Sequence, residues 1–292
     1  MKLGIGLPNT MAFETDRRLM LDWARLADEA GFHTLGTIDK PAYDSWDPLV
    51  TLAGVAGVTE RARLATTILQ LPNRNETLVA KQAAVVDRLS SGRLDLGVAQ
   101  GGRGADYDVF GAPPEGRSQR LEEQVARMRE LWENARRSDP DHGVTGPAPL
   151  QDPLPVWVGA SRPKAIERAV RVGDGFLFGT RGAAGMAEAT PRIRELAAAE
   201  GKRDFPVAGL AYAGLGDDPA AALEEAAHHV LRYYGQLWTE PADLIHHGPA
   251  GKIAEEIAAY ARSGIDLLIV FPQIPRLDQV EQLAESVLPD FL

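Results

Sequence analysis

Short apolar runs recur along the chain and are separated by longer amphipathic segments. Runs of this length, rich in Leu, Ile, Val, Ala and Gly, are typical of buried β-strands. The strands predicted in this way are Leu3–Leu7, Thr34–Ile38, Leu64–Leu69, Leu94–Ala99, Val156–Gly159, Gly175–Phe178, Val207–Tyr212 and Leu267–Phe271.

The segments between these runs carry apolar residues at the helical period of 3.6. In the first segment, Leu19, Trp23, Leu26 and Ala30 fall on one stripe, and Gly31 is placed to end the helix in a left-handed conformation. The regular alternation of eight strands with helices predicts a parallel (β/α)8 TIM barrel of class α/β. A doubly wound open sheet is the structural alternative.

A single domain is expected to span residues 1–292. The Pro/Gly-rich segment Ser138–Pro155 departs most from the alternation, and it is interpreted as a loop excursion before the fifth strand rather than as an interdomain linker. Further excursions at the catalytic face, Gly102–Gly116 and Gly179–Gly185, are where substrate selectivity is expected to lie.

In a (β/α)8 barrel, the loops after strands carry the chemistry and the loops after helices carry stability. The second predicted strand is followed at once by Asp39 and Lys40, and then by Tyr43 and Trp46. Charged and aromatic residues at the point where a strand leaves the core indicate a binding pocket. Arginines at the same face are candidates for binding an anionic part of a cofactor or substrate: Arg74, Arg103, Arg162 and Arg181.

Composition narrows the possible partners. The formal net charge of −10 argues against nucleic acid, which needs a basic face. No apolar run approaches the roughly 18 residues of a membrane span, and the N-terminus has a strand pattern rather than a signal peptide, so a cytoplasmic location is expected. Because there is no cysteine and the two His-His pairs lack the spacing of a helical zinc site, no metal site is expected.

Two glycine-containing segments follow predicted strands. Gly97–Gly104 lacks the spacing of the dinucleotide fingerprint, so it indicates either close approach to a planar or phosphorylated ligand or a flexible connection. In Val156–Ile166, a strand, a turn and a helix follow one another, and Ser161 lies at the turn. Ser161 fits a helix N-cap, and it fits equally a phosphate site with Gly159 and Arg162 beside it.

Lys40 allows three interpretations. It could form a Schiff base, as barrel aldolases place a lysine at a strand end, it could stabilise negative charge, or it could form a surface pair with an aspartate. Asp39 and Asp44 are expected to keep the ammonium group charged, which argues against a nucleophile of lowered pKa.

Segments throughout the chain resemble the luciferase-like flavin-dependent oxidoreductases, which include FMN monooxygenases and enzymes that use coenzyme F420. The resemblance agrees with the predicted barrel, since this family has the (β/α)8 fold. The segments that carry it are Leu3–Asn9, Ala27–Phe32, Val58–Leu69, Leu78–Ala84, Asp87–Gly97, Val156–Ser161 and Ala250–Phe271.

The resemblance implies a flavin ring over the barrel mouth and its phosphate at the turn after the fifth strand. It also implies a non-prolyl cis peptide bond, which here would be Thr67–Ile68, as well as a homodimer and a small-molecule substrate. The lack of long insertions favours F420 slightly over FMN. The cofactor-binding residues are then Thr67, Ile68, Gln100, Gly101, Gly159, Ala160, Ser161 and Arg162.

The second strand departs from the family pattern, because related deazaflavin enzymes carry Asp-His where this chain has Asp39-Lys40. Lys40 is expected to stabilise negative charge during hydride transfer at the N5 position of the cofactor, with Asp39 orienting it. Tyr43 or Trp46 is expected to form an apolar wall. The glutamate that sugar-phosphate-oxidising relatives place after strand four is absent, which argues against sugar dehydrogenation.

Two other function classes stay open. Without the usual histidine, the barrel could bind a flavin without turnover. Alternatively, Lys40 could serve a Schiff-base aldolase.

Overall fold

Eight parallel strands close into a barrel in this computed structural model, which describes residues 1–11, 13–137, 146–237 and 239–291. The sheet closes because β10 pairs with β1 on one side and with β8 on the other. This closure confirms the barrel and excludes the open sheet. The barrel strands are β1 (Lys2–Gly6), β2 (Thr34–Thr37), β3 (Arg63–Thr66), β5 (Leu94–Ala99), β6 (Val156–Gly159), β7 (Gly175–Leu177), β8 (Val207–Leu215) and β10 (Leu267–Pro272).

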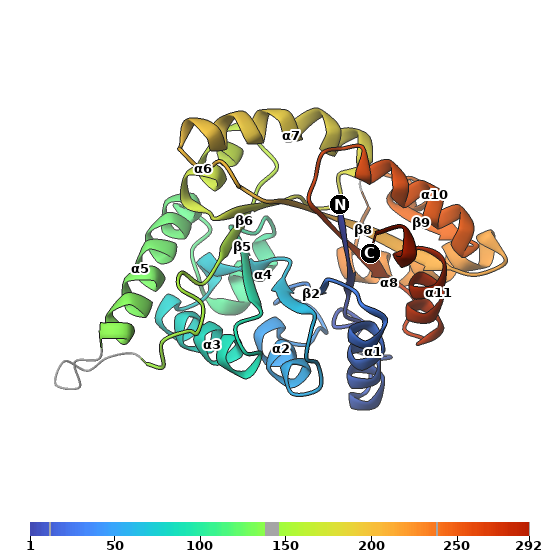
Figure 1. Ribbon diagram of the computed structural model, residues 1–292, viewed down its shortest axis with the longest axis horizontal. Coiled ribbons are helices and arrows are strands. Elements are labelled where there is room, and N and C mark those ends of the chain that lie inside the picture. Colours follow the sequence, from blue (N-terminus) through green and yellow to red (C-terminus); the bar gives the residue numbers. More distant parts are fainter. Residues whose placement is uncertain (12, 138–145, 238, 292) are drawn as a thin grey trace.

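Helices surround the barrel on its outside (Figure 1). The first helix shows why they form: Asp16 caps its N-terminus by accepting from the amide of Leu19, and Gly31 ends it at φ 99°, as predicted. The helices are α1 (Arg17–Ala30), α2 (Pro48–Ala56), α3 (Glu76–Leu89), α4 (Gly104–Phe110), α5 (Arg117–Arg137), α6 (Pro163–Val172), α7 (Gly182–Ala199), α8 (Pro219–Tyr234), α9 (Pro241–Leu244), α10 (Ala250–Ala261) and α11 (Asp278–Ser286), with 3₁₀ turns η1 (Leu71–Asn73) and η3 (Leu288–Phe291).

Two short strands differ from the predicted pattern. The predicted strand Leu64–Leu69 is divided into β3 and β4 (Leu69–Gln70), and the Thr67–Ile68 peptide bond between them is cis, as the resemblance implied. Strand β9 (Ile245–Gly248) was not predicted; it pairs with the far end of β8, outside the closed ring.

The predicted loop excursions connect these elements. Residues 138–145 of the excursion Ser138–Pro155 lie outside the described residues. The excursion after β5 contains α4, and the excursion after β7 leads into α7. In the part of the chain that the structure describes, no helix combines the length and apolar character needed to cross a bilayer.

Candidate active site

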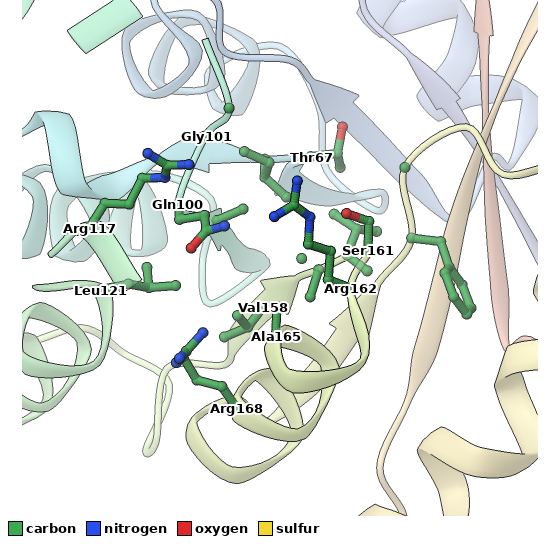
Figure 2. A pocket seen from close by; sticks show the side chains of 18 of the residues that line it. Thr67, Gln100, Gly101, Arg117, Leu121, Val158, Ser161, Arg162, Ala165 and Arg168 are labelled. Carbon is green, nitrogen blue, oxygen red and sulfur yellow. The ribbon is translucent and has the colours of Figure 1, made fainter. Parts of the chain in front are cut away.

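A cavity of about 390 Å³ opens at the carboxyl ends of β3, β5, β6 and β7 (Figure 2). Cofactor sites typically have volumes of ~300–1,000 Å³, so this cavity is large enough to hold one. The structure brings together the whole set predicted to bind the cofactor, since all of its members line this cavity: Thr67, Ile68, Gln100, Gly101, Gly159, Ala160, Ser161 and Arg162.

Two glycines on the cavity wall leave little space for a side chain. A Cβ atom at Gly159 would lie 3.2 Å from Cγ2 of Ile68 and 3.3 Å from the carbonyl oxygen of Leu177. Gly101 has φ 70°, and a Cβ atom there would lie 2.2 Å from Oε1 of Gln70. Bare backbone therefore forms part of the wall, where a ligand can approach the peptide groups closely.

Ser161 does not cap the helix that follows it. Helix α6 begins at Pro163 and its N-cap residue is Arg162, so the N-cap interpretation of Ser161 is wrong. Ser161 is exposed and lines the cavity, and its hydroxyl has no hydrogen-bond partner within the described residues. This hydroxyl can therefore bind a ligand.

Three arginines give this cavity its charge. Arg168 donates to Glu122 at 2.6 Å, and Arg171 donates to the same carboxylate at 2.7 Å, so Arg168 already has a partner of opposite charge. Arg117 and Arg162 have no carboxylate partner among the described residues, and their side chains reach into the cavity from α5 and from the turn before α6 (Figure 2). Guanidinium groups without a carboxylate, beside a hydroxyl and bare backbone, suit a phosphate group.

A second chamber of about 260 Å³ adjoins the cofactor cavity. The two share part of their walls, including Thr67 and Ile68 at the cis peptide bond. A ligand in the first cavity would thus lie beside a ligand in the second. The residues that line the chamber are Ile38, Asp39, Lys40, Thr67, Ile68, Gln70, Gly101, Gly102, Arg103, Asp106, Gly179, Thr180, Leu210, Tyr212, Tyr233 and Tyr234.

Lys40 lies between two aromatic rings at the wall of this chamber. Its Nζ atom is 4.4 Å from the ring centre of Tyr43 and 4.3 Å from that of Tyr233. The residue is 6% exposed, and this burial, together with the charge of Arg103, lowers the pKa of Lys40 to about 8, while Asp106 opposes the shift. The expectation of a surface pair is therefore wrong, and the nearby aspartates do not hold the pKa of Lys40 at its ordinary value, although the ammonium form still predominates at neutral pH.

Asp39 binds a different partner from the one predicted. Its carboxylate accepts from Arg74 at 2.9 Å and from the amide of Gln70 at 2.9 Å, and Arg74 also pairs with Asp47 at 3.0 Å. Burial raises the pKa of Asp39, and the charge of Arg74 opposes that shift. The prediction that Asp39 orients Lys40 is wrong, because the carboxylate is held by Arg74.

The predicted substrate-pocket residues are only partly brought together. Arg103 lines the chamber. Tyr43 is not among the residues that line it, but its ring packs against Lys40, which does line it. Arg74 lies behind Asp39, and Trp46 packs on the hydrophobic core while its amide donates to the carbonyl of Asn9 at 2.9 Å. Arg181 is the N-cap residue of α7 and lies 4.0 Å from Glu188, outside both cavities.

Residues that the sequence patterns did not single out complete the chamber. Tyr233 and Tyr234 end helix α8, and the hydroxyl of Tyr234 lies 2.8 Å from that of Tyr212 on β8. Burial raises the pKa of all three phenols. The sequence feature that could have predicted this wall is the Tyr233-Tyr234 pair at the end of a predicted helix. An apolar helical stripe would not place two aromatic residues next to each other.

Comparisons with known proteins show what this chain is similar to. The luciferase-like monooxygenase family matches residues 1–267. The oxygenase component of a flavin-dependent trigonelline monooxygenase from Acinetobacter baylyi is 31% identical over 53% of this chain and 46% of its own length. A putative coenzyme F420-dependent oxidoreductase of Mycobacterium tuberculosis is 28% identical over 82% of this chain and 75% of its own length. This chain thus spans less than half of the first relative and three quarters of the second.

Two solved structures share the fold along the whole chain. A monooxygenase from Streptomyces bottropensis has a TM-score of 0.82 at 21% identity and covers 100% of both chains. An F420-dependent secondary alcohol dehydrogenase in complex with an F420–acetone adduct has a TM-score of 0.82 at 18% identity and covers 100% of this chain and 99% of its own. At these identities the likeness shows the barrel fold alone.

Proposed function

Because the chain belongs to the luciferase-like monooxygenase family, we propose that it is a flavin-type oxidoreductase that transfers a hydride between coenzyme F420 and a small organic substrate. FMN is the alternative cofactor. One observation carries this proposal: an arginine-lined cavity and a lysine-lined chamber share the wall at the Thr67–Ile68 cis peptide bond.

The first cavity fits the phosphate-bearing part of the cofactor. Ser161, Arg162 and Arg117 supply a hydroxyl and two guanidinium groups, and Gly159 leaves the backbone bare beside them. Thr67, Ile68 and Gly179 line both cavities, which suits a flat ring between them. When bound, the cofactor supplies the hydride donor or acceptor, and FMN would in addition react with oxygen.

Lys40 acts on the substrate oxygen in this proposal. Its ammonium group lies at the chamber wall, and a pKa of about 8 allows it to hold or release a proton near neutral pH. When a carbonyl is reduced, Nζ stabilises the negative charge that develops on the oxygen and donates the proton. The tyrosine side chains and Leu210 limit the entry of water.

Two considerations favour F420 over FMN. The putative F420-dependent relative matches 82% of this chain, whereas the flavin-dependent one matches 53%. The family resemblance gives the same preference, because this chain lacks long insertions.

A turnover assay tests the proposal. We expect the purified protein to oxidise reduced F420, followed by its absorbance, with at least one ketone or aldehyde from a panel of small carbonyl compounds, and to run the reverse reaction with the matching alcohol. The control is the same protein without carbonyl compound. Absence of turnover by a protein that binds F420 stoichiometrically would identify the flavin-binding barrel without catalysis.

A Schiff-base aldolase is the second candidate, and the environment of Lys40 favours it. The lowered pKa of about 8 weakens the objection that nearby aspartates keep the amine protonated, because a minor fraction of the amine is neutral near pH 7. Borohydride reduction in the presence of a substrate aldehyde would trap a covalent adduct on Lys40 if this candidate is right. We expect no Lys40-specific adduct, and Lys40→Met serves as the control.

A further inference from the structure

The chamber beside Lys40 presents hydrogen-bond donors that lack acceptors. Nζ of Lys40 and Cζ of Arg103 lie 4.3 Å and 5.3 Å from the ring centre of Tyr233. Arg103 donates one hydrogen bond, to the carbonyl of Tyr233 at 3.1 Å, and Lys40 Nζ has no acceptor among the described residues. The two cations thus contact the same ring, and most of their N–H donors have no acceptor among the described residues. Such a pair can bind an anion that presents oxygen atoms.

The carboxylates near the chamber do not take up these donors. Asp39 is held by Arg74 and by the amide of Gln70. Asp106 accepts from the amide of Ala42 at 3.1 Å and from Nε2 of Gln70 at 2.9 Å. Asp106 raises the pKa of Lys40, yet neither aspartate forms an ion pair with Lys40 or Arg103 in the described part of the chain. The charges of Lys40 and Arg103 thus stay available to a ligand.

The remaining wall is apolar and aromatic. Ile38, Leu210 and the rings of Tyr212, Tyr233 and Tyr234 line the chamber, and the hydroxyls of Tyr212 and Tyr234 bond to each other. A ligand with a flat apolar body would pack well on these rings, and a negative charge at one end of it would meet the two cations.

We propose that this chamber binds the carboxylate of a small organic acid, with Arg103 holding the carboxylate and Lys40 reaching both the carboxylate and the reacting oxygen next to it; these two are then the specificity-determining residues. The inference rests on the proposed function, because it names the substrate class of the same oxidoreductase. A carboxylate matches the planar fork of a guanidinium group, whereas the adjoining cavity has its own arginines for phosphate. The acid would lie beside the shared wall at Ile68, where the cofactor ring is expected.

Binding of benzoate to the protein without cofactor tests the inference, with benzamide as the neutral analogue of the same shape. We expect isothermal titration calorimetry to give a Kd of about 1–10 mM for benzoate, and binding at least about 10-fold weaker for benzamide. Arg103→Gln and Lys40→Met should each weaken benzoate binding by about 10-fold and leave benzamide binding unchanged. Arg162→Gln, in the cofactor cavity, should leave benzoate binding unchanged.

Several results would overturn the inference. Equal binding of benzoate and benzamide would show that the charge is not recognised, and so would unchanged benzoate binding in a folded Arg103→Gln protein. Loss of benzoate binding in Arg162→Gln alone would place the anion in the cofactor cavity. Parallel titrations with F420 and with FMN separate the two proposals: binding of either cofactor without benzoate leaves the oxidoreductase proposal intact, and binding of benzoate without either cofactor refutes that proposal instead.

Discussion

Replacement of Lys40 by Met is expected to lower kcat by about 100- to 1,000-fold and to leave the affinity for the cofactor unchanged. Positioned proton donors contribute roughly 10²–10⁴-fold to rate, and groups that stabilise a developing oxyanion contribute a similar factor. Met keeps the length of the side chain but removes the charge and the proton. Lys40 lines the substrate chamber and not the cofactor cavity, so binding of the cofactor should persist.

The role of Lys40 as proton donor also predicts how the rates of the two reaction directions depend on pH. Lys40 donates a proton only while it is protonated, so carbonyl reduction should slow as the pH rises through about 8, and alcohol oxidation should speed up over the same range. The Lys40→Met protein should lose this dependence in both directions. Lys81→Met, on the outer helix α3, is the matched control and should behave as the unaltered protein. A wild-type pH profile in Lys40→Met would refute the role of Lys40.

Replacement of both Arg117 and Arg162 by Gln is expected to weaken cofactor binding by about 100-fold or more. A hydrogen bond to a charged group is worth roughly 1.5–3 kcal/mol, so Arg117→Gln and Arg162→Gln should each cost about 10- to 100-fold in Kd. Fluorescence titration with F420 or FMN measures this change. The effect should decrease at high salt, because part of the attraction is between exposed charges.

Arg171→Gln provides the matched control for this double variant. Arg171 lies on α6, the helix that follows Arg162, but it donates to Glu122 and does not line the cavity. Its replacement should change the Kd of the cofactor by less than about 2-fold, since surface ion pairs contribute little. If the double variant binds as tightly as Arg171→Gln, the phosphate does not lie between Arg117 and Arg162.

The meeting of the proposed cofactor-binding residues in one cavity could be predicted from the sequence because they come in short segments at strand ends. Thr67–Ile68 follows β3, and Gly159–Arg162 begins at the last residue of β6. In a closed barrel the carboxyl ends of neighbouring strands meet at one face, so correct strand order is enough to bring such segments together. Arg117 was missed, because it comes from the start of α5 and not from a strand end.

The substrate chamber could be predicted only in part, for two physical reasons. Tyr233 and Tyr234 reach it from the end of α8, and the place where a helix end docks is decided by tertiary packing rather than by periodicity. The predicted Asp39–Lys40 pair failed because the two side chains, which follow the end of β2, have different partners in the folded chain. Asp39 meets Arg74, and Lys40 meets the aromatic rings.

The most direct test of the central claim is a parallel titration of the purified protein with F420 and with FMN, followed by intrinsic tryptophan fluorescence. The account predicts saturable binding of F420 at a ratio of one per chain, in the micromolar range or tighter, and weaker binding of FMN. Tight binding of FMN alone would correct the choice of cofactor and keep the flavin-type oxidoreductase. Binding of neither cofactor by the folded protein would contradict the account.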